Sequence, residues 1–143
     1  MQLWDVDSGQ VRASYRCYNA QDEITACTSL ACTADGAKIY CGAKNCLYAF
    51  DIARPGREYT FVPTFCKKEG GIRGLISSIA FSKVDPGIYA IGSYNGSVGI
   101  FSAETEALQL RLEGHAAGIT KVHDVESCHP SDVAVKFPGV VFS

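Results

Sequence analysis

An internal repeat constrains the fold of this chain more than any other feature. The segment TSLACTADGAKIYC (28–41) aligns without a gap with SSIAFSKVDPGIYA (77–90), at an offset of 49 residues. Ser, Ala, Ile and Tyr coincide in the two segments. Three further segments (3–9, 47–56 and 98–106) each place an aromatic residue at the end of an expected strand, just before a polar turn. A period of ~40–50 residues made only of short strands is typical of a β-propeller blade.

The distribution of polar residues predicts which strands are buried on both faces. Neither face of LISSIAF (75–81) carries a charge, and IYAIGS and VGIF behave in the same way. By contrast, LQLRLE (108–113) and VRASYRC (11–17) alternate between apolar and polar residues. Alternation indicates one wet face, whereas uniformly apolar strands are covered on both faces. Pro63 falls in an expected outer strand, where an edge tolerates the missing donor. Each repeat therefore predicts buried inner strands and a half-exposed outer strand.

We expect an all-β fold made of about two and a half to three four-stranded propeller blades. The predicted units are the end of a truncated blade (1–19), a blade (20–66), a second blade (67–113), and the start of a further blade with a divergent tail (114–143). No long amphipathic helical stretch supports an α/β sheet. An immunoglobulin-like sandwich remains an alternative for this chain length, but a sandwich has no need to repeat internally.

Composition narrows the class of protein. The chain has 143 residues, a net charge of −2, 20% charged residues and 47% hydrophobic residues, which excludes a disordered tail and gives no overall basic footprint for nucleic acid. It shows no signal-peptide pattern and no apolar run of membrane-spanning length. We therefore interpret the seven cysteines as reduced thiols of an intracellular protein.

Two Cys-x4-Cys pairs raise the question of a zinc site. The candidate ligands are Cys27 with Cys32, Cys41 with Cys46, and later His123, Cys128 and His129. Five residues apart on one strand, the two thiols of a pair would lie on opposite faces. Structural zinc sites also favour shorter spacings on turns. We therefore interpret these residues as small buried thiols, and predict no metal site and no cofactor.

No motif supports catalysis. The chain has no Gly-x-Ser-x-Gly elbow and no phosphate-binding loop that ends in Gly-Lys-Ser or Gly-Lys-Thr. His115 would need partners that the sequence does not supply, so a catalytic base is the weaker interpretation. We predict that the protein is not an enzyme.

The pairs Trp4-Asp5 and Gly114-His115 resemble the two signatures of WD-repeat propellers. In these repeats the His is structural and ties the loop before a blade to that blade's inner strands. Within the WD-repeat family, about residues 2–120 resemble the telomerase Cajal body protein family. The segments ARPGRE and TFCKKEG are the more diagnostic part of this likeness, because generic WD repeats lack them. The second and third units end in Phe-Asp and Phe-Ser instead of Trp-Asp, and the sequence after Thr120 loses blade character.

This resemblance implies a non-catalytic RNA-binding scaffold of small Cajal-body ribonucleoproteins, including telomerase. Its implied partners are small Cajal-body RNA, telomerase RNA and the proteins of these particles. Its implied location is nuclear, in Cajal bodies, with the cytoplasm as an additional compartment. The alternative is a WD-repeat adaptor that binds proteins and has no RNA role.

Basic residues between Ile52 and Gly74 suggest where RNA could bind. Five basic side chains face two acidic ones there, whereas the rest of the chain is acidic overall. Successive turns of an antiparallel blade emerge at opposite ends, so Arg54 and Arg57 should lie on one rim of the propeller and the remaining three on the other. The residues we predict to contact RNA are Lys67, Lys68, Arg73 and Tyr94, the last by stacking on a base.

Overall fold

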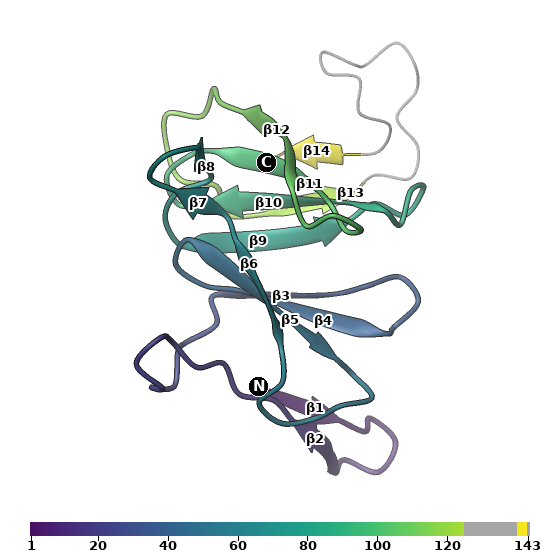
Figure 1. The fold of residues 1–143 in the computed structure, drawn as a ribbon. Coiled ribbons are helices and arrows are strands. Elements are labelled where there is room, and N and C mark those ends of the chain that lie inside the picture. Colours follow the sequence, from purple (N-terminus) through teal and green to yellow (C-terminus); the bar gives the residue numbers. More distant parts are fainter. Residues whose placement is uncertain (125–139, 143) are drawn as a thin grey trace.

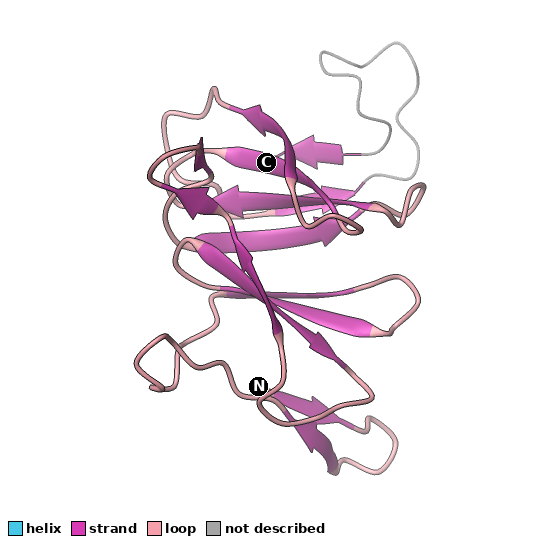
Figure 2. Cartoon of the chain, viewed as in Figure 1, coloured by secondary structure: helices cyan, strands magenta, loops and turns pink. Residues whose placement is uncertain are grey.

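The computed structural model describes residues 1–124 and 140–142. Within them lie fourteen strands and no helix, so none is long and apolar enough to span a membrane. Two four-stranded antiparallel sheets dominate the fold, and the remaining strands form three two-stranded hairpins (Figure 2). The all-β prediction is confirmed.

The first sheet has the order β3-β4-β5-β6 and the second the order β9-β10-β11-β12. The first contains β3 (Ser29–Cys32), β4 (Lys38–Gly42), β5 (Cys46–Asp51) and β6 (Thr60–Pro63). The second contains β9 (Ile76–Phe81), β10 (Ile88–Ser93), β11 (Val98–Ser102) and β12 (Leu108–Leu112). The hairpins pair β1 (Gln2–Trp4) with β2 (Val11–Ser14), β7 (Phe65–Cys66) with β8 (Gly70–Gly71), and β13 (Val122–Asp124) with β14 (Val140–Phe142).

Each sheet falls inside one predicted blade, β3 to β6 within 20–66 and β9 to β12 within 67–113. The hairpin of β7 and β8 crosses the predicted boundary between them, and the boundaries themselves stay a prediction. The predicted burial is confirmed for β11, which is buried throughout, and for the half-exposed β12. It is wrong for the innermost strands β3 and β9, which are only partly buried. Pro63 ends the edge strand β6, as its missing donor requires.

The two sheets lie side by side, with the innermost strands β3 and β9 adjacent (Figure 1). Hydroxyl groups join these strands across the gap between the sheets. Thr28 Oγ1 and Ser29 Oγ donate to the backbone oxygen of Ile76, at 2.6 and 2.8 Å. At the repeat-equivalent position, Ser78 Oγ accepts from the backbone nitrogen of Val122 at 3.0 Å. The same small polar residues therefore connect successive units, which explains part of the repeat.

The pairing registers correct the gap-free alignment of the two repeats. Cys32 pairs with Ile39 in the first sheet, and Phe81 pairs with Tyr89 in the second. β3 therefore matches β9 at an offset of 49, whereas β4 matches β10 at an offset of 50. The extra residue lies in the turn between β9 and β10. Because side chains alternate along a strand, this one-residue shift reverses the face to which Tyr89 points, relative to Tyr40.

That reversal brings two tyrosines of different sheets together. Tyr40 and Tyr89 are both buried, and their ring centroids are 5.3 Å apart. Both hydroxyl groups donate to the carboxylate of Glu106, at 2.5 and 2.7 Å. Burial, followed by these bonds to Glu106, raises the pKa of both tyrosines, so both keep the protons that they donate.

Three buried layers result from this arrangement, and the third, beside the second sheet, contains Ala90, Val98, Ile100, Ile119 and Val122. The first layer lies between the β1–β2 hairpin and the first sheet, and the second layer lies between the two sheets. The first layer contains Tyr15, Cys17, Ile39, Cys41, Ala43, Cys46, Tyr48 and Phe50. The second layer contains Tyr40, Leu47, Ala49, Val62, Ile72, Ile76, Ile79, Tyr89, Ile91 and Phe101.

Candidate nucleic-acid interface

The hairpin of β7 and β8 carries the predicted basic residues. Lys67 and Lys68 occupy its turn and are exposed. Gly70 and Gly71 follow with φ of 79° and 112°, a conformation that favours glycine. A Cβ atom on Gly71 would lie 2.3 Å from the backbone oxygen of Thr64, so the hairpin needs a glycine there. The local sequence thus holds both lysine side chains in solvent on a narrow hairpin.

Arg73 lies against the base of this hairpin. Its guanidinium carbon is 5.7 Å from the centroid of the Phe65 ring. This distance suits a cation–π contact, which leaves the edge of the guanidinium free to bind another group. The backbone oxygen of Arg73 accepts a bond from Ser93 Oγ at 2.5 Å, which joins this segment to the end of β10.

Tyr94 lies at the β10–β11 turn, directly after Ser93. Its backbone nitrogen donates to the oxygen of Leu75 at 3.1 Å, so its main chain is held against the segment that follows Arg73. Its side chain is 56% exposed. The structure therefore brings Arg73 and Tyr94 to the same rim, with an aromatic ring open to solvent.

The two predicted basic groups lie at opposite ends of β5. The backbone nitrogen of Asn45, which precedes β5, donates to the oxygen of Gly74 at 2.9 Å, which places Arg73 at that end. Arg54 follows the other end of β5, where its backbone nitrogen bonds Asp51. The expectation of two separate rims agrees with this geometry.

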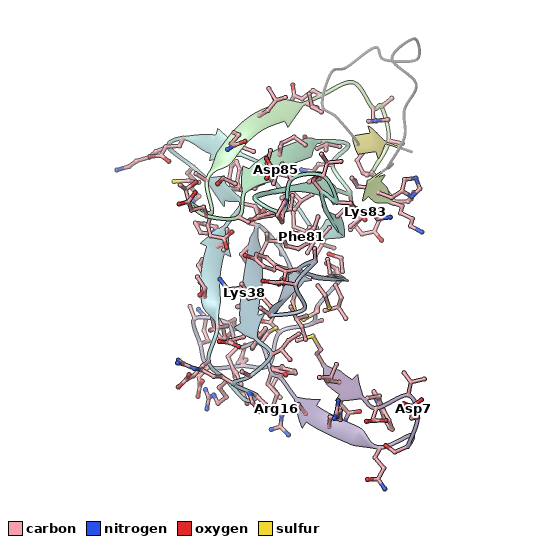
Figure 3. The ribbon with its side chains drawn as sticks, turned by 90° about the vertical axis from the view of Figure 1, so that its right-hand side faces the viewer. Asp7, Arg16, Lys38, Phe81, Lys83 and Asp85 are labelled. Atoms are coloured by element: carbon pink, nitrogen blue, oxygen red, sulfur yellow. The ribbon has the colours of Figure 1, made fainter. Side chains whose placement is uncertain are left out.

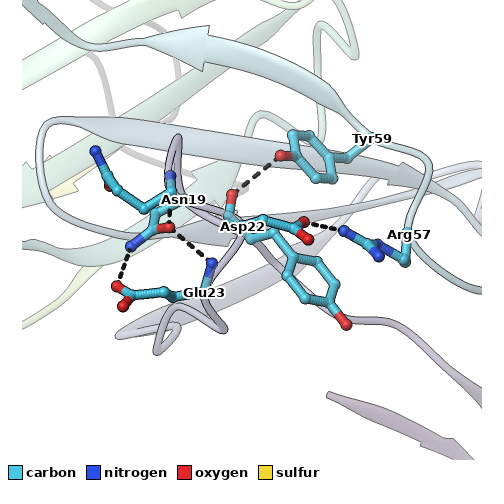
Figure 4. A network of polar contacts seen from close by, with 7 residues as sticks. Asn19, Asp22, Glu23, Arg57 and Tyr59 are labelled. Carbon is cyan, nitrogen blue, oxygen red and sulfur yellow. Dashed lines mark hydrogen bonds and ion pairs between the residues drawn. The ribbon is translucent and has the colours of Figure 1, made fainter.

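Arg57, on the opposite rim, is already engaged within the protein (Figure 4). Its guanidinium pairs with Asp22 and lies 3.9 Å from the centroid of the Tyr18 ring. The hydroxyl group of Tyr59 donates to the backbone oxygen of Tyr18 at 3.0 Å and closes the same network. A phosphate would have to displace these partners, so this rim is the weaker candidate for binding nucleic acid.

Acidic residues restrict which side of the hairpin could face a phosphate. A groove runs between the hairpin and the second sheet, and Cys66, Glu69, Glu106 and Leu108 line part of it. Two carboxylates in that groove repel an anion. Phosphate contacts therefore fit the turn and the outer side of the hairpin.

The residues that resemble WD-repeat signatures lie at the surface. Trp4 is 55% exposed. Asp5 Oδ1 accepts bonds from the backbone nitrogens of Ser8 and Asp7, at 2.9 and 3.0 Å, and these bonds, led by Ser8, lower the pKa of Asp5. Asp5 thereby stabilises the turn of the β1–β2 hairpin.

Gly114 and His115 lie in the loop that follows β12, at the start of the fourth predicted unit. Gly114 has a φ of 153°, and the His115 side chain is exposed. The backbone oxygen of His115 lies over Gly96, 2.7 Å from where a Cβ atom would be. Within residues 1–124 its imidazole has no hydrogen-bond or ion-pair partner, so its structural role stays a prediction.

The cysteine pairs require a correction. Cys41 and Cys46 are not on one strand, because the chain turns between β4 and β5 at Asn45, whose φ is 62°. Both thiols therefore lie in the first layer and not on opposite faces. Of the other pair, Cys32 is exposed at the end of β3. His123 is exposed in β13, and Cys128 and His129 lie outside the described residues.

Sequence spacing did not reveal which thiols meet. The Sγ atoms of Cys17, Cys27 and Cys41 all lie within 4.8 Å of one another. Hydrogen bonds from the thiols of Cys17 and Cys41 lower the pKa of Cys27, which is the partly exposed member of the three. Cys17 lies 10 residues before Cys27, at the end of the alternating segment 11–17, and nothing in that pattern indicates that the two thiols meet.

Comparison with protein-family profiles finds no match. The chain is 43% identical over 118 residues to telomerase Cajal body protein 1 of Homo sapiens, which covers 82% of this chain and 21% of the relative. It is 36% identical over 123 residues to the telomerase Cajal body protein 1 homolog of Drosophila melanogaster, covering 84% of this chain and 21% of the relative. The chain spans about a fifth of the length of these curated relatives.

Solved structures confirm the architecture. The WD40 repeats of RRP9 match with a TM-score of 0.62 and 20% identity, over 71% of this chain and 30% of that chain. At this identity the likeness shows the fold alone. The two antiparallel four-stranded sheets and the sequence relatives together show that the chain belongs to the WD-repeat β-propeller family and is homologous to telomerase Cajal body protein 1.

Proposed function

We propose that this chain is part of a non-catalytic RNA-binding scaffold of small Cajal-body ribonucleoproteins, including telomerase, that brings its RNA to Cajal bodies in the nucleus. The observation that carries the proposal is the 43% identity to telomerase Cajal body protein 1 over 82% of the chain. The name of that relative connects it to telomerase and to Cajal bodies. Partners of the scaffold are small Cajal-body RNA, telomerase RNA and the proteins of these particles.

The rim that carries Lys67, Lys68, Arg73 and Tyr94 is the proposed RNA contact. The two lysines are exposed at a hairpin turn, and within the described residues neither forms an ion pair with a carboxylate, in contrast to Arg57 on the opposite rim. The ring of Tyr94 is open to solvent and can stack on an unpaired base. Basic side chains that bind phosphates and an exposed aromatic ring that stacks on a base are recurring features of proteins that bind single-stranded RNA.

The test is crosslinking and sequencing of RNA bound to the intact protein in its native cells. It compares the wild type with a Lys67→Glu/Lys68→Glu/Arg73→Glu variant. We expect enrichment of small guide-type nuclear RNAs by the wild type and loss of that enrichment in the variant. In vitro, the slope of log affinity against log salt should fall by about 2, at ~0.7 per phosphate contact on single strands.

A charge-matched control separates this rim from general electrostatics. Arg16, Lys38 and Arg54 are exposed near the opposite rim, where Arg16 N bonds the Gly56 oxygen and Lys38 pairs with Asp51 in the first sheet. Figure 3 labels Arg16 and Lys38. Arg16→Glu/Lys38→Glu/Arg54→Glu changes the net charge equally and should keep RNA binding. Equal loss in both variants contradicts the proposed contact. Absence of RNA enrichment above a nuclease-treated control supports a protein–protein adaptor instead.

A further inference from the structure

Three thiols converge in the first layer from three separate segments of the chain. Cys17 follows β2, Cys27 precedes β3, and Cys41 lies within β4. Their Sγ atoms all lie within 4.8 Å of one another, and Cys17 Sγ is 3.2 Å from Cys27 Sγ. Cys17 and Cys41 are buried, whereas Cys27 is partly exposed. The cluster therefore has two buried thiols and one thiol that solvent can reach.

The second layer shows that the fold does not need sulfur at these positions. Backbone pairing establishes the equivalences, because Thr25 N bonds the oxygen of Cys17 just as Ile72 N bonds the oxygen of Thr64. The sheet registers make Cys41 equivalent to Ile91. Thr28 Oγ1 donates to the Gly42 oxygen as Ser77 Oγ donates to the Gly92 oxygen, which makes the preceding residues, Cys27 and Ile76, equivalent. The equivalent positions are Cys17 and Thr64, Cys27 and Ile76, and Cys41 and Ile91. Two isoleucines and a threonine thus suffice at the positions where the first layer has three thiols.

We propose that Cys17, Cys27 and Cys41 form a metal-binding site for a thiophilic d¹⁰ cation, Zn²⁺ or Cu⁺. Three cysteine sulfurs are the ligand set that such cations prefer. Zinc–sulfur bonds of about 2.3 Å place the sulfurs of a zinc site ~3.8 Å apart. Cys17 Sγ and Cys27 Sγ are 3.2 Å apart and no pair of the three exceeds 4.8 Å, so side-chain movements of about 1 Å or less suffice to enclose an ion.

The surroundings supply a further sulfur ligand and a route of entry. The Sδ atom of Met1 lies 3.5 Å from Cys41 Sγ, which adds a soft thioether beside the three thiols. An ion can enter past Cys27, the partly exposed member. Each thiol that becomes a thiolate ligand releases its proton to solvent, so binding is coupled to proton release.

The test measures metal content and affinity on the intact, reduced protein under anaerobic conditions. Zn²⁺ and Cu⁺ are added separately against a competing chelator, and Cd²⁺ serves as a spectroscopic probe through its sulfur-to-metal absorption. We expect one ion per chain. Tighter binding of one cation under competition identifies which of the two the site prefers, and both results support the site.

Two variants and two controls locate the ligands. Cys27→Ser changes the partly exposed member and should fold, yet lower the affinity by at least ~10-fold. The triple variant Cys17→Ser/Cys27→Ser/Cys41→Ser should lose the cadmium absorption. Cys46→Ser tests whether any serine hydroxyl buried in the first layer lowers the affinity. Cys32→Ser tests whether the loss of an exposed thiol outside the cluster does so. Both controls should keep binding.

Three results would overturn the proposal. The first is no stoichiometric ion in the wild type. The second is equal affinity in Cys27→Ser and the wild type, or an equal loss in Cys46→Ser. The third is a Cys17–Cys27 disulfide, visible as the loss of two hydrogens in the mass of protein isolated without reductant, together with no metal binding after reduction.

Discussion

The first and second layers are built on the same positions of the repeat, yet they are filled differently. Phe50 in the first layer and Phe101 in the second are equivalent, and each is at most 1% exposed. At the position where the second layer has Ile91, the first has Cys41. The shared aromatic residue marks what the blade fold requires. Positions that differ, such as Cys41 and Ile91, are those at which the blade fold accepts different side chains.

The layers also differ in how polar groups are satisfied. In the second layer, Tyr40 and Tyr89 from two sheets share the carboxylate of Glu106. In the first layer, the hydroxyl group of Tyr15 donates to the backbone oxygen of Ile52 at 2.9 Å. A charged acceptor gives stronger bonds than a neutral carbonyl, so the second layer should depend more on its polar contacts.

The largest expected effect comes from truncating the shared aromatic position in each layer. Phe50→Ala and Phe101→Ala each remove a buried ring, and should each lower the free energy of unfolding of the intact protein by ~3–5 kcal/mol. Urea denaturation of the two variants beside the wild type measures both. Similar losses would show that the layers are packed equally well.

A much smaller loss of unfolding free energy for Phe50→Ala than for Phe101→Ala would contradict equal packing of the two layers. Phe61 provides a matched control, because it is an aromatic residue of the first sheet that is 54% exposed. Phe61→Ala should cost much less than either core variant, since little buried apolar surface is removed.

The second prediction tests the polar difference. Glu106→Ala leaves the hydroxyl groups of Tyr40 and Tyr89 without their acceptor and should lower the free energy of unfolding by ~2 kcal/mol. Tyr15→Phe removes one neutral hydrogen bond and should cost ~1 kcal/mol. Chemical denaturation again supplies the measurement. Glu106→Gln keeps an acceptor and should recover part of the loss, and equal costs for Glu106→Ala and Tyr15→Phe would refute the ranking.

The repeat predicted the sheets but not how their side chains meet. The period, the uncharged strands and the turn residues were sufficient for an all-β blade architecture, because strand patterns are local. The gap-free alignment placed Tyr40 over Tyr89, and the register shows instead that one extra turn residue reverses the face of Tyr89. A difference of one residue in a turn cannot be weighed from sequence identity alone, although it decides which rings touch.

The candidate sites likewise contain some residues that the sequence could place and others that it could not. Lys67, Lys68 and Arg73 could be assigned to one rim, because strand direction follows from the order of the turns. The meeting of Cys17 with Cys27 could not be foreseen, because it depends on backbone pairing between irregular segments, such as the bond from Thr25 N to the oxygen of Cys17. The single-strand spacing rule wrongly placed Cys41 and Cys46 on opposite faces, and it did not consider Cys17.

The smallest expected effect concerns the hydroxyl groups that join successive inner strands. Ser29 Oγ donates to the oxygen of Ile76 at 2.8 Å, and its equivalent, Ser78, contacts the backbone of Val122. Ser29→Ala and Ser78→Ala should each lower the free energy of unfolding by ~0.5–1.5 kcal/mol, the usual net value of one such bond. Urea denaturation of each variant and of the double variant measures the two costs and their coupling. The two bonds connect different pairs of units, so their costs should add. A clearly non-additive double variant would mean that the junctions between units are not independent, and that the two layers cannot be treated as separate parts of one repeat.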